Sequence, residues 1–278
     1  MNKSILITGC SSGIGLEAAH TLRQRGYRVF ASCRKNADVE RLQGEGFADA
    51  LVLDLASSNS IQTAVDQVLE RTSGQLFALF NNAAYGLPGA VEDLPRAALQ
   101  RQFETNVFGT HELTCRLLPT LLKQPDARIV QNSSVLGLVA MFNRGAYVAS
   151  KFALEGLTDT LRLELHGTSV KVVLIEPGPI LSDFRKNALA MFQHEIDMES
   201  SRHQALYRTA LERLNKQGAA APFTLPASAV VDKLILALER AKPKPRYYVT
   251  KPTYVMGTLK RLLSTSMLDR VIRRLGSA

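Results

Sequence analysis

Tyr147 and Lys151 have the types and the spacing for proton transfer. They stand four positions apart in a stretch with helical periodicity, so their side chains would lie on one face of a helix. A free tyrosine titrates at about pH 10, and a neighbouring ammonium would favour the phenolate and lower that pKa. The phenol could therefore exchange a proton with a carbonyl or an alcohol. Carbonyl reduction is the easier direction for this group, because a neutral phenol already carries the proton to be donated, whereas alcohol oxidation requires the phenol to lose it first.

A second chemical feature is the glycine-rich loop that follows the first apolar run, with the pattern Thr-Gly-x-x-x-Gly-x-Gly at 8–15. Glycine permits a tight turn and lets backbone N–H groups approach a pyrophosphate at a helix N-terminus. The pattern alone is weak, but here it stands between a strand-like run and helical sequence. The expected dinucleotide contacts in this loop are Gly9, Ser11, Ser12, Gly13, Ile14 and Gly15.

The segment after the second apolar run indicates which dinucleotide is bound. It reads Ala-Ser-Cys-Arg-Lys at 31–35, with Arg34 and Lys35 and no carboxylate. Proteins that select NAD usually place an acid about 20 residues beyond the glycines. A carboxylate would repel a 2′-phosphate, whereas a guanidinium can hold it by charge-assisted hydrogen bonds. We therefore expect NADP(H); the alternative is two solvated cations before the next helix.

The elements that must position these residues alternate along the chain. Apolar runs stand at 5–7, 28–31, 50–53, 76–80, 129–130 and 170–175, and segments such as 57–73 and 97–122 have helical periodicity. Strands that are apolar throughout are buried on both faces. The alternation predicts an α/β fold, a single Rossmann-type domain with a doubly wound parallel sheet and helices on both faces. A helix at about 226–241 and a strand at 246–249 would complete it.

These motifs, in this order, resemble those of the classical short-chain dehydrogenase/reductase family. Further matches are Asn81-Asn82-Ala83-Ala84, Tyr147-Val148-Ala149-Ser150-Lys151 and Pro177-Gly178, and the likeness is close over residues 3–183. The glycine loop and the segment Ile175–Ile180 look like the retinol and 17-beta-hydroxysteroid dehydrogenase branch and its bacterial NADP-dependent aldehyde reductase relatives. Ala84 and Ser182 depart from the commoner glycine and threonine without removing a reactive atom.

The resemblance assigns roles to further residues. Ser134, thirteen positions before Tyr147, would hold the substrate oxygen, and Asn106 would position Lys151 through a water. Asp54, after the third strand, would hold the adenine amino group, although capping of the next helix explains it equally well. The resemblance gives the catalytic set Asn106, Ser134, Tyr147 and Lys151, and the further cofactor contacts Leu55, Asn81, Ala83, Tyr147, Lys151, Pro177, Gly178, Ile180 and Ser182.

The stretch 179–222 breaks the alternation and reads as a helical lid over the substrate. Some of its apolar residues must pack on the sheet, but the surplus, with its flexible methionines, favours an apolar pocket. A small hydrophobic aldehyde or ketone, resembling retinal, a steroid or a fatty aldehyde, is the expected substrate. The apolar set is Leu181, Phe184, Leu189, Met191, Phe192, Ile196, Met198, Leu206, Tyr207, Leu211 and Leu214.

The net charge of +9 lies in the C-terminal region. Residues 240–278 hold ten basic residues and a single acid, Asp269, while the rest of the chain is balanced. This distribution argues against nucleic acid as a partner and predicts an anionic partner for the tail alone. The domain would span 1–250, followed by a basic amphipathic extension at 251–278. One helical face of the extension would carry Met267, Leu268, Val271, Ile272 and Leu275, with Arg270, Arg273 and Arg274 elsewhere.

Such a helix could lie peripherally on a membrane, cover the mouth of the active site, or pack on a partner subunit. A homo-oligomer, dimer or tetramer, is compatible with the helices expected at 97–122 and 145–165. No run is long enough to span a bilayer, and no signal-peptide pattern begins the chain, so we expect a cytoplasmic protein. Cys10, Cys33 and Cys115 would be small buried residues in a reducing compartment, and neither cysteines nor histidines show metal-ligand spacing.

The sequence therefore predicts an NADP-dependent oxidoreductase that reduces carbonyl groups, with Tyr147 as proton donor. An epimerase or dehydratase of the extended branch would need a different glycine spacing. A non-catalytic NADP-binding redox sensor of the same fold is the alternative from another class, since fold does not imply function. The complete set of four catalytic residues argues against the sensor, which needs no proton donor.

Overall fold

A single parallel sheet of seven strands organises the molecule, whose computed structural model describes residues 3–216, 218–219 and 221–276. The strand order is β3-β2-β1-β4-β5-β6-β7. In such sheets ligands bind at the carboxyl ends of the strands where the order reverses, here between β1 and β4. The strands are β1 (Ser4–Ile7), β2 (Arg28–Cys33), β3 (Leu51–Val52), β4 (Ala78–Asn81), β5 (Ala127–Asn132), β6 (Val170–Glu176) and β7 (Arg246–Tyr248).

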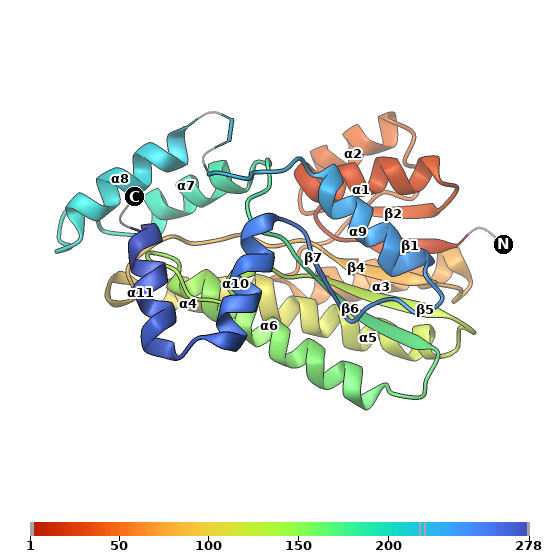
Figure 1. Cartoon of the computed structure of the whole chain (residues 1–278). Coiled ribbons are helices and arrows are strands. Elements are labelled where there is room, and N and C mark those ends of the chain that lie inside the picture. Colours follow the sequence, from red (N-terminus) through yellow and green to blue (C-terminus); the bar gives the residue numbers. More distant parts are fainter. Residues whose placement is uncertain (1–2, 217, 220, 277–278) are drawn as a thin grey trace.

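Helices cover both faces of the sheet, and the predicted doubly wound α/β fold is confirmed (Figure 1). One core lies under α1 (Gly13–Gln24), α2 (Asn36–Gly44) and α9 (Ser228–Glu239). The other lies under α3 (Ser58–Thr72) and α5 (Thr110–Leu122). In β1, Ile5 and Ile7 belong to the first core and Leu6 to the second, because successive side chains of a strand point to opposite faces. Both faces being buried explains the continuously apolar strands.

The helix expected over 97–122 is interrupted. The chain forms α4 (Arg96–Phe103), then a π-helical turn η2 (Glu104–Gly109), and only then α5. Close packing accompanies the interruption: a Cβ on Gly109 would lie 1.8 Å from the carbonyl oxygen of Leu55. π-Bulges of this kind occur frequently at functional sites, and this one carries Asn106. The sequence of this turn keeps the apolar spacing of an ordinary α-helix, so nothing in the sequence predicts the interruption.

The lid region contains two helices, α7 (Phe184–Glu195) and α8 (Gln204–Asn215), which lie to one side of the sheet (Figure 1). Phe192, Ile196 and Tyr207 are buried in a third, smaller core together with Leu87 and Ala146. These three lid residues thus hold the lid on the domain instead of offering free pocket surface. By contrast, the side chain of Leu181 is 50% exposed.

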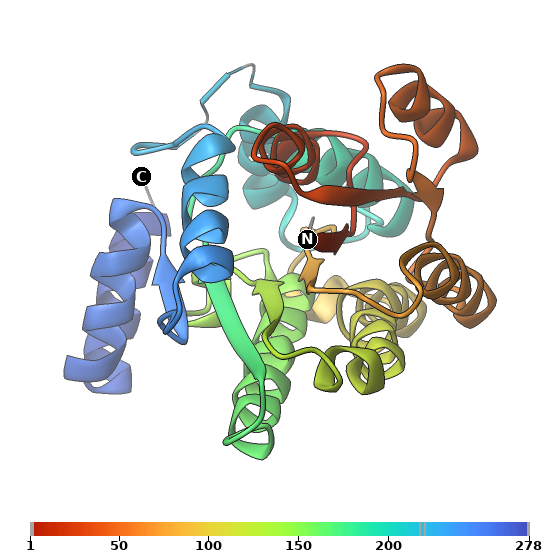
Figure 2. The ribbon, with the colours of Figure 1, turned by 90° about the vertical axis from the view of Figure 1, so that its right-hand side faces the viewer.

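Two helices follow β7: α10 (Lys251–Leu262) and α11 (Thr265–Gly276). They lie at the sheet edge opposite α2 (Figure 2). The expected apolar face of the tail is divided, because Leu268 is buried whereas Met267 is 48% exposed; the side chain of Leu275 lies outside the described residues. In the described part of the chain, no helix has the length and apolar character needed to cross a membrane.

Two short 3-10 turns and one long helix complete the order of elements. The turns are η1 (Val91–Asp93) and η3 (Val135–Gly137), and the helix is α6 (Gly145–Glu164), which carries Tyr147 and Lys151. Among the cysteines, Cys10 and Cys33 are buried as expected, but Cys115 is exposed, since it lies on the outer face of α5.

Candidate active site

Helix α6 places Tyr147 and Lys151 on one buried face. Both side chains are nearly inaccessible, at 9% and 3% exposure. The ammonium of Lys151 lies 5.7 Å from the centroid of the Tyr147 ring. It also donates a hydrogen bond to the carbonyl oxygen of Asn132, at the end of β5, over 2.7 Å. The predicted i, i+4 pair is therefore present, and the end of β5 anchors its lysine.

The pKa of the phenol differs from the sequence-based expectation. Burial raises the pKa of Tyr147 to about 12, and a hydrogen bond with Ser134 and the charge of Arg144 only partly oppose this. Burial also lowers the pKa of Lys151 to about 8, against the opposing charge of Glu155. The expected lowering of the tyrosine pKa by Lys151 was wrong for the protein without its ligands, because desolvation of the phenolate outweighs nearby positive charge. Tyr147 is thus fully protonated at neutral pH.

Ser134 and Asn106 reach α6 from two other elements. Ser134 follows β5 in extended conformation, and its hydroxyl accepts from the backbone N–H of Leu136 at 3.1 Å. The amide of Asn106 donates to Ser150 Oγ at 3.1 Å, next to Lys151 in sequence, and to the Tyr85 carbonyl at 2.9 Å. Asn106 therefore contacts the helix beside the lysine, and all four predicted catalytic residues come together around α6.

The glycine loop has the geometry of a phosphate cradle. Gly9 and Gly13 have φ values of 74° and 57°, in the left-handed region that favours glycine. A Cβ on Gly15 would lie 2.1 Å from the carbonyl oxygen of Gly9, so no other residue fits there. The loop leads into α1, with Ser12 as its extended N-cap, and Ser11 and Ile14 flank this start. These residues fit a dinucleotide pyrophosphate at the helix N-terminus.

Asn82 joins this loop to the catalytic residues, and the sequence analysis did not select it. Its amide donates to the carbonyl oxygen of Thr8 at 2.9 Å and of Gly9 at 3.3 Å. Its own side-chain oxygen accepts from Asn132 Nδ2 at 2.9 Å. Thr8 Oγ1 in turn accepts from the backbone N–H of Asn82 and of Ala83, both at 2.9 Å. The repeated asparagine at 81–82 was the available signal.

Asn81 lies at the end of β4, beside this network. Its amide donates to Thr114 Oγ1 at 2.9 Å, while its side-chain oxygen is buried with no partner among the described residues. A buried acceptor without a partner is costly. The free oxygen is consistent with the predicted contact between Asn81 and the dinucleotide.

The basic pair after β2 is accessible. Arg34 and Lys35 are exposed, and the described residues provide no hydrogen bond or ion pair for their side chains. Arg41, one turn into α2, was not predicted; it donates to the carbonyl oxygen of Ser11 at 2.8 Å and pairs with Glu45. The predicted cationic end of β2 thus adjoins the glycine loop, with a third cation at its side.

Asp54 and Leu55 follow β3. The carboxylate of Asp54 accepts from the backbone N–H of Ala56 at 3.0 Å, which holds a turn. The N-cap of α3 is Ser57, which accepts from the N–H of Ser60, so the alternative in which Asp54 caps this helix was wrong. Leu55 is buried against Gly109 of the π turn.

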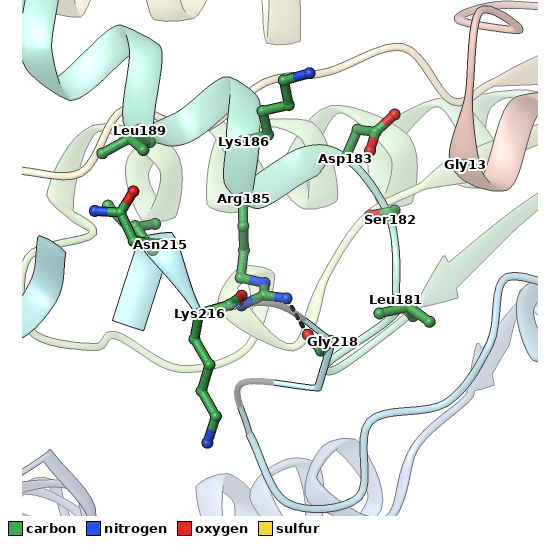
Figure 3. Close-up of a pocket in the computed structure, with 11 residues that line it drawn as sticks. Gly13, Leu181, Ser182, Asp183, Arg185, Lys186, Leu189, Asn215, Lys216 and Gly218 are labelled. Atoms are coloured by element: carbon green, nitrogen blue, oxygen red, sulfur yellow. Dashed lines mark hydrogen bonds between the residues drawn. The ribbon is translucent and has the colours of Figure 1, made fainter. Parts of the chain in front are cut away.

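The loop after β6 closely approaches Gly13 of the glycine loop, and together with α7 and the end of α8 it lines a cavity of about 600 Å³ (Figure 3). A Cβ on Gly13 would lie 3.1 Å from that of Ser182. Pro177 accepts from the N–H of Val135 at 2.7 Å, and Ile180 bridges to Leu225. Arg185, which lines the cavity, binds carbonyl oxygens at the end of α8, among them that of Gly218. Gly178 packs so tightly on Thr250 that a Cβ would lie 2.1 Å from its hydroxyl.

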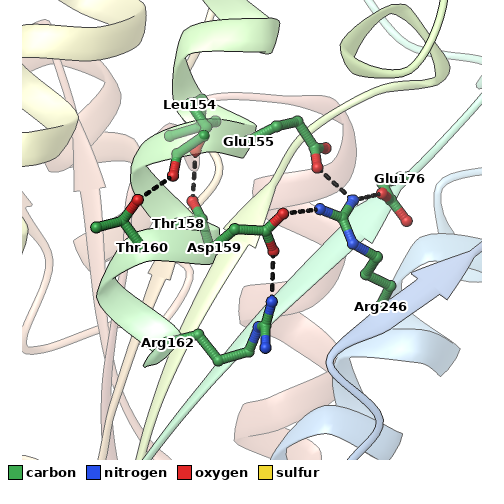
Figure 4. Close-up of polar contacts among 9 residues, drawn as sticks. Leu154, Glu155, Thr158, Asp159, Thr160, Arg162, Glu176 and Arg246 are labelled. Carbon is green, nitrogen blue, oxygen red and sulfur yellow. Dashed lines mark hydrogen bonds and ion pairs between the residues drawn. The ribbon is translucent and has the colours of Figure 1, made fainter. Parts of the chain in front are cut away.

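A partly buried ion cluster joins α6 to β6 and β7 (Figure 4). Arg246 of β7 binds Glu155 and Asp159 of α6 and Glu176 of β6. Burial, reinforced by the charge of Glu155, raises the pKa of Glu176 to about 8. Burial raises the pKa of Glu155 as well. Three acids thus surround the one guanidinium of Arg246 at the carboxyl end of β6, and Glu176 is the one whose pKa lies near neutral pH.

Comparison with known proteins identifies the family. The model of the short chain dehydrogenase family matches residues 3–193. The chain is 45% identical to the uncharacterized oxidoreductase YbbO of Escherichia coli K12, covering 98% of this chain and 95% of that protein. It is 38% identical to human retinol dehydrogenase 8 over 68% of this chain and 62% of that one. It is 31% identical to the NADPH-dependent 3-dehydrocapnine reductase of Ornithobacterium rhinotracheale, over 96% and 94%.

Solved structures agree in fold. A short chain dehydrogenase/reductase from Burkholderia phymatum in complex with NAD has a TM-score of 0.78 and 25% identity, covering 94% of this chain and 92% of that one. A short chain dehydrogenase from Burkholderia cenocepacia in complex with NADP has a TM-score of 0.75 and 20% identity, covering 98% and 97%. The matched family, the fold and the residues assembled around α6 lead to one conclusion: this chain belongs to the classical short-chain dehydrogenase/reductase family of oxidoreductases, in its retinol dehydrogenase-like branch.

Proposed function

We propose that the protein reduces hydrophobic aldehydes or ketones to alcohols with NADPH, with Tyr147 as the proton donor. The observation that carries this proposal is the state of Tyr147. The phenol is buried beside Lys151 and hydrogen-bonded with Ser134, and burial raises its pKa to about 12, so it carries at neutral pH the proton that carbonyl reduction requires. The bound dinucleotide supplies the hydride.

The chain's own residues have distinct tasks in this reaction. Ser134 would hold the substrate oxygen, Tyr147 would give its proton to that oxygen as negative charge develops, and Lys151, held by Asn132, would stabilise the resulting phenolate. Asn106 positions the helix at Ser150. Ser134 and Tyr147 would therefore act on the substrate oxygen directly, and Lys151 and Asn106 would support them.

Two features support NADPH and an apolar substrate. The exposed Arg34 and Lys35 suit a 2′-phosphate, and the segment 31–35 itself holds no carboxylate. The ring of Phe184 packs edge-on to Tyr147, with centroids 5.3 Å apart, so an apolar wall stands beside the reacting group. A Cβ on Gly86 would lie 2.7 Å from Phe184. A similar protein is named retinol dehydrogenase 8, and that name is in keeping with a substrate that carries its reacting group on a hydrophobic molecule.

Oxidation of NADPH in the presence of aldehydes of increasing length, all-trans-retinal and a steroid ketone tests the proposal, with NADH and Tyr147→Phe as controls. Turnover should need NADPH, rise with chain length and disappear in Tyr147→Phe. Reduction of small polar carbonyls alone would overturn the substrate class. Tight NADPH binding without turnover of any carbonyl would instead favour the redox sensor.

The tail has a separate proposed role. The exposed side chains of Leu262 and Met267 lie close in sequence to Lys260, Arg261 and Arg270, a combination that suits peripheral contact with an anionic membrane. Sedimentation with phosphatidylserine vesicles should retain the full chain and release a version that ends at Leu263, after α10. Equal binding by both versions would exclude α11 as the contact, and a change in sedimentation coefficient without vesicles would point to a subunit interface.

A further inference from the structure

Arg144 differs from the other sheltered arginines of the protein. Within the described residues, six arginines are buried or partly buried, and five have guanidinium hydrogen bonds to carboxylates or carbonyl oxygens: Arg28, Arg128, Arg162, Arg185 and Arg246. The guanidinium of Arg144 has no hydrogen bond or ion pair with any described residue. Arg128, although only 1% exposed, binds Asp126 and three carbonyl oxygens. In this protein, a sheltered arginine therefore normally has hydrogen bonds that compensate for the loss of water around its guanidinium.

The surroundings of Arg144 increase the free-energy cost of sheltering its positive charge from water. Burial, together with the charge of Arg213 on α8, lowers its pKa to about 10, which leaves it charged at neutral pH. Arg144 is half-buried, and a sheltered charge without a partner is unfavourable; a second cation nearby makes it more so. A purely structural role would call for a carboxylate at this position. The structure shows instead a site that lacks a negative charge.

Arg144 is also close to the reaction. It is the N-cap of α6 and precedes Tyr147 by three residues. Its charge acts on the Tyr147 phenol. Its backbone is tied to Gly89 by a β-bridge, so the first turn of α6 is held in place. The backbone that carries Arg144 is therefore held beside the catalytic helix, and the charge of Arg213 on α8 of the lid acts on the Arg144 guanidinium.

We infer that Arg144 binds an acidic group of the substrate, so that the preferred carbonyl compound carries a carboxylate near its carbonyl in addition to an apolar body. A guanidinium offers a planar fork of donors that matches a carboxylate with two parallel hydrogen bonds. Arg213 would add long-range attraction from the lid. The anion would supply the missing charge, and lid and domain would be joined through it. This inference rests on the proposed carbonyl reduction and narrows its substrate class.

The test compares 4-carboxybenzaldehyde with its methyl ester, which has the same aldehyde and the same ring without the charge. In the wild-type protein the acid should have the lower KM. Arg144→Met should raise KM for the acid about 10- to 100-fold, as expected for loss of a hydrogen bond to a charged group, while KM for the ester stays within about twofold. Any change in kcat should be the same for the acid and the ester, because the charge of Arg144 also acts on Tyr147. Arg144→Lys should restore part of the difference. Arg208→Met, an exposed arginine on α8, is the matched control.

Binding measured without turnover separates this inference from the proposed function. Calorimetric titration of both compounds into the Tyr147→Phe protein with NADP⁺ should show the same Arg144-dependent preference for the acid even if no carbonyl is reduced. If Arg144→Met weakened the affinity for the acid and for the ester equally, Arg144 would have a structural role and the inference would be overturned. A weaker affinity for NADPH in Arg144→Met, with the acid and the ester still alike, would assign the guanidinium to a dinucleotide phosphate and also overturn it.

Thermal stability provides a further readout. Replacing an arginine that holds the fold together lowers the stability of the protein. An arginine without a partner can be replaced by methionine with no loss of stability, because apolar replacements of buried charges are often neutral or stabilising. Arg144→Met should therefore melt at the same temperature as the wild type or higher. A clear decrease in melting temperature, with no difference between acid and ester, would contradict the inference.

Discussion

Asn132 donates a hydrogen bond to Asn82 across 2.9 Å, and this contact joins the two halves of the site. On one side, Asn82 holds the carbonyl oxygens of Thr8 and Gly9 in the glycine loop. On the other, the backbone carbonyl of Asn132 accepts from the ammonium of Lys151. Dinucleotide loop and proton-transfer helix are thus positioned by one chain of hydrogen bonds across the ends of β1, β4 and β5.

Replacement of Asn82 should loosen both the glycine loop and the end of β5 that anchors Lys151. Asn82→Ala leaves the Asn132 amide and the Thr8 carbonyl without their partners, which costs about 1–3 kcal/mol for a sheltered group. We expect roughly tenfold weaker NADPH binding in a fluorescence titration, together with a lower melting temperature. Asn187→Ala, at an exposed position on α7, is the control. Unchanged NADPH affinity in Asn82→Ala would show that the network does not support the loop.

The rate of reduction should depend on the charge of Lys151. The folded protein holds the pKa of this lysine at about 8 by burial, so the ammonium is lost as pH rises through that value. Because kcat/KM reports ionisations of the free enzyme, it should be level below about pH 8 and fall above it, well before Tyr147 titrates. The residual activity of Lys151→Arg, which stays charged, should lack this decline. A profile that stays level to pH 10 in the wild type would contradict the assignment.

Stability should decrease with rising pH because of Glu176. Its pKa is raised in the folded state to about 8, whereas the unfolded chain would titrate at about 4.3. Between these values the folded protein binds the extra proton, so this contribution to stability is complete below the lower value and is lost as pH rises through the higher one. Glu176→Gln should remove this dependence and melt at a higher temperature than the wild type at pH 8. Parallel pH curves of melting temperature for the two proteins would show that Glu176 is ionised throughout.

Cofactor preference should depend on Arg34. Arg34→Glu removes a cation that suits the 2′-phosphate and introduces a repulsive carboxylate, the group that NAD-selecting proteins place near this position. The ratio of kcat/KM for NADPH over NADH should fall about 100-fold, chiefly through KM for NADPH. Arg25→Glu, on the far end of α1, controls for net charge, although it also breaks a surface pair with Glu239. An unchanged ratio would return Arg34 to the role of a solvated cation.

The fold was predictable because its signals are local. Most strands of the sheet contain an apolar run in their own sequence, as in Val172–Ile175, and Gly9, Gly13 and Gly15 stand in adjacent turns where only glycine fits. The Tyr147 and Lys151 pair was equally local, since one helix carries both residues. Such patterns require no knowledge of what packs where.

The remaining features depend on pairs that are distant in sequence. The contact of Asn82 with Asn132 spans 50 residues, and Arg246 meets Glu155 across 91. Neither separation leaves a recognisable spacing. The direction of the Tyr147 pKa shift also escaped prediction, because it results from burial, which the sequence of α6 does not display. Arg144 was overlooked for the opposite reason: its distinction is the lack of a partner.

The position of α10 gives the tail a connection to turnover. This helix packs against η3, the turn that follows Ser134, and Thr250, the residue before α10, packs against Gly178. Both loops that flank the reacting centre therefore rest on the beginning of the C-terminal extension. A partner that shifts the extension would change the affinity for the dinucleotide. By thermodynamic reciprocity the dinucleotide would change the affinity for that partner by the same factor, so the metabolic supply of the cofactor would determine how tightly the tail holds what it binds.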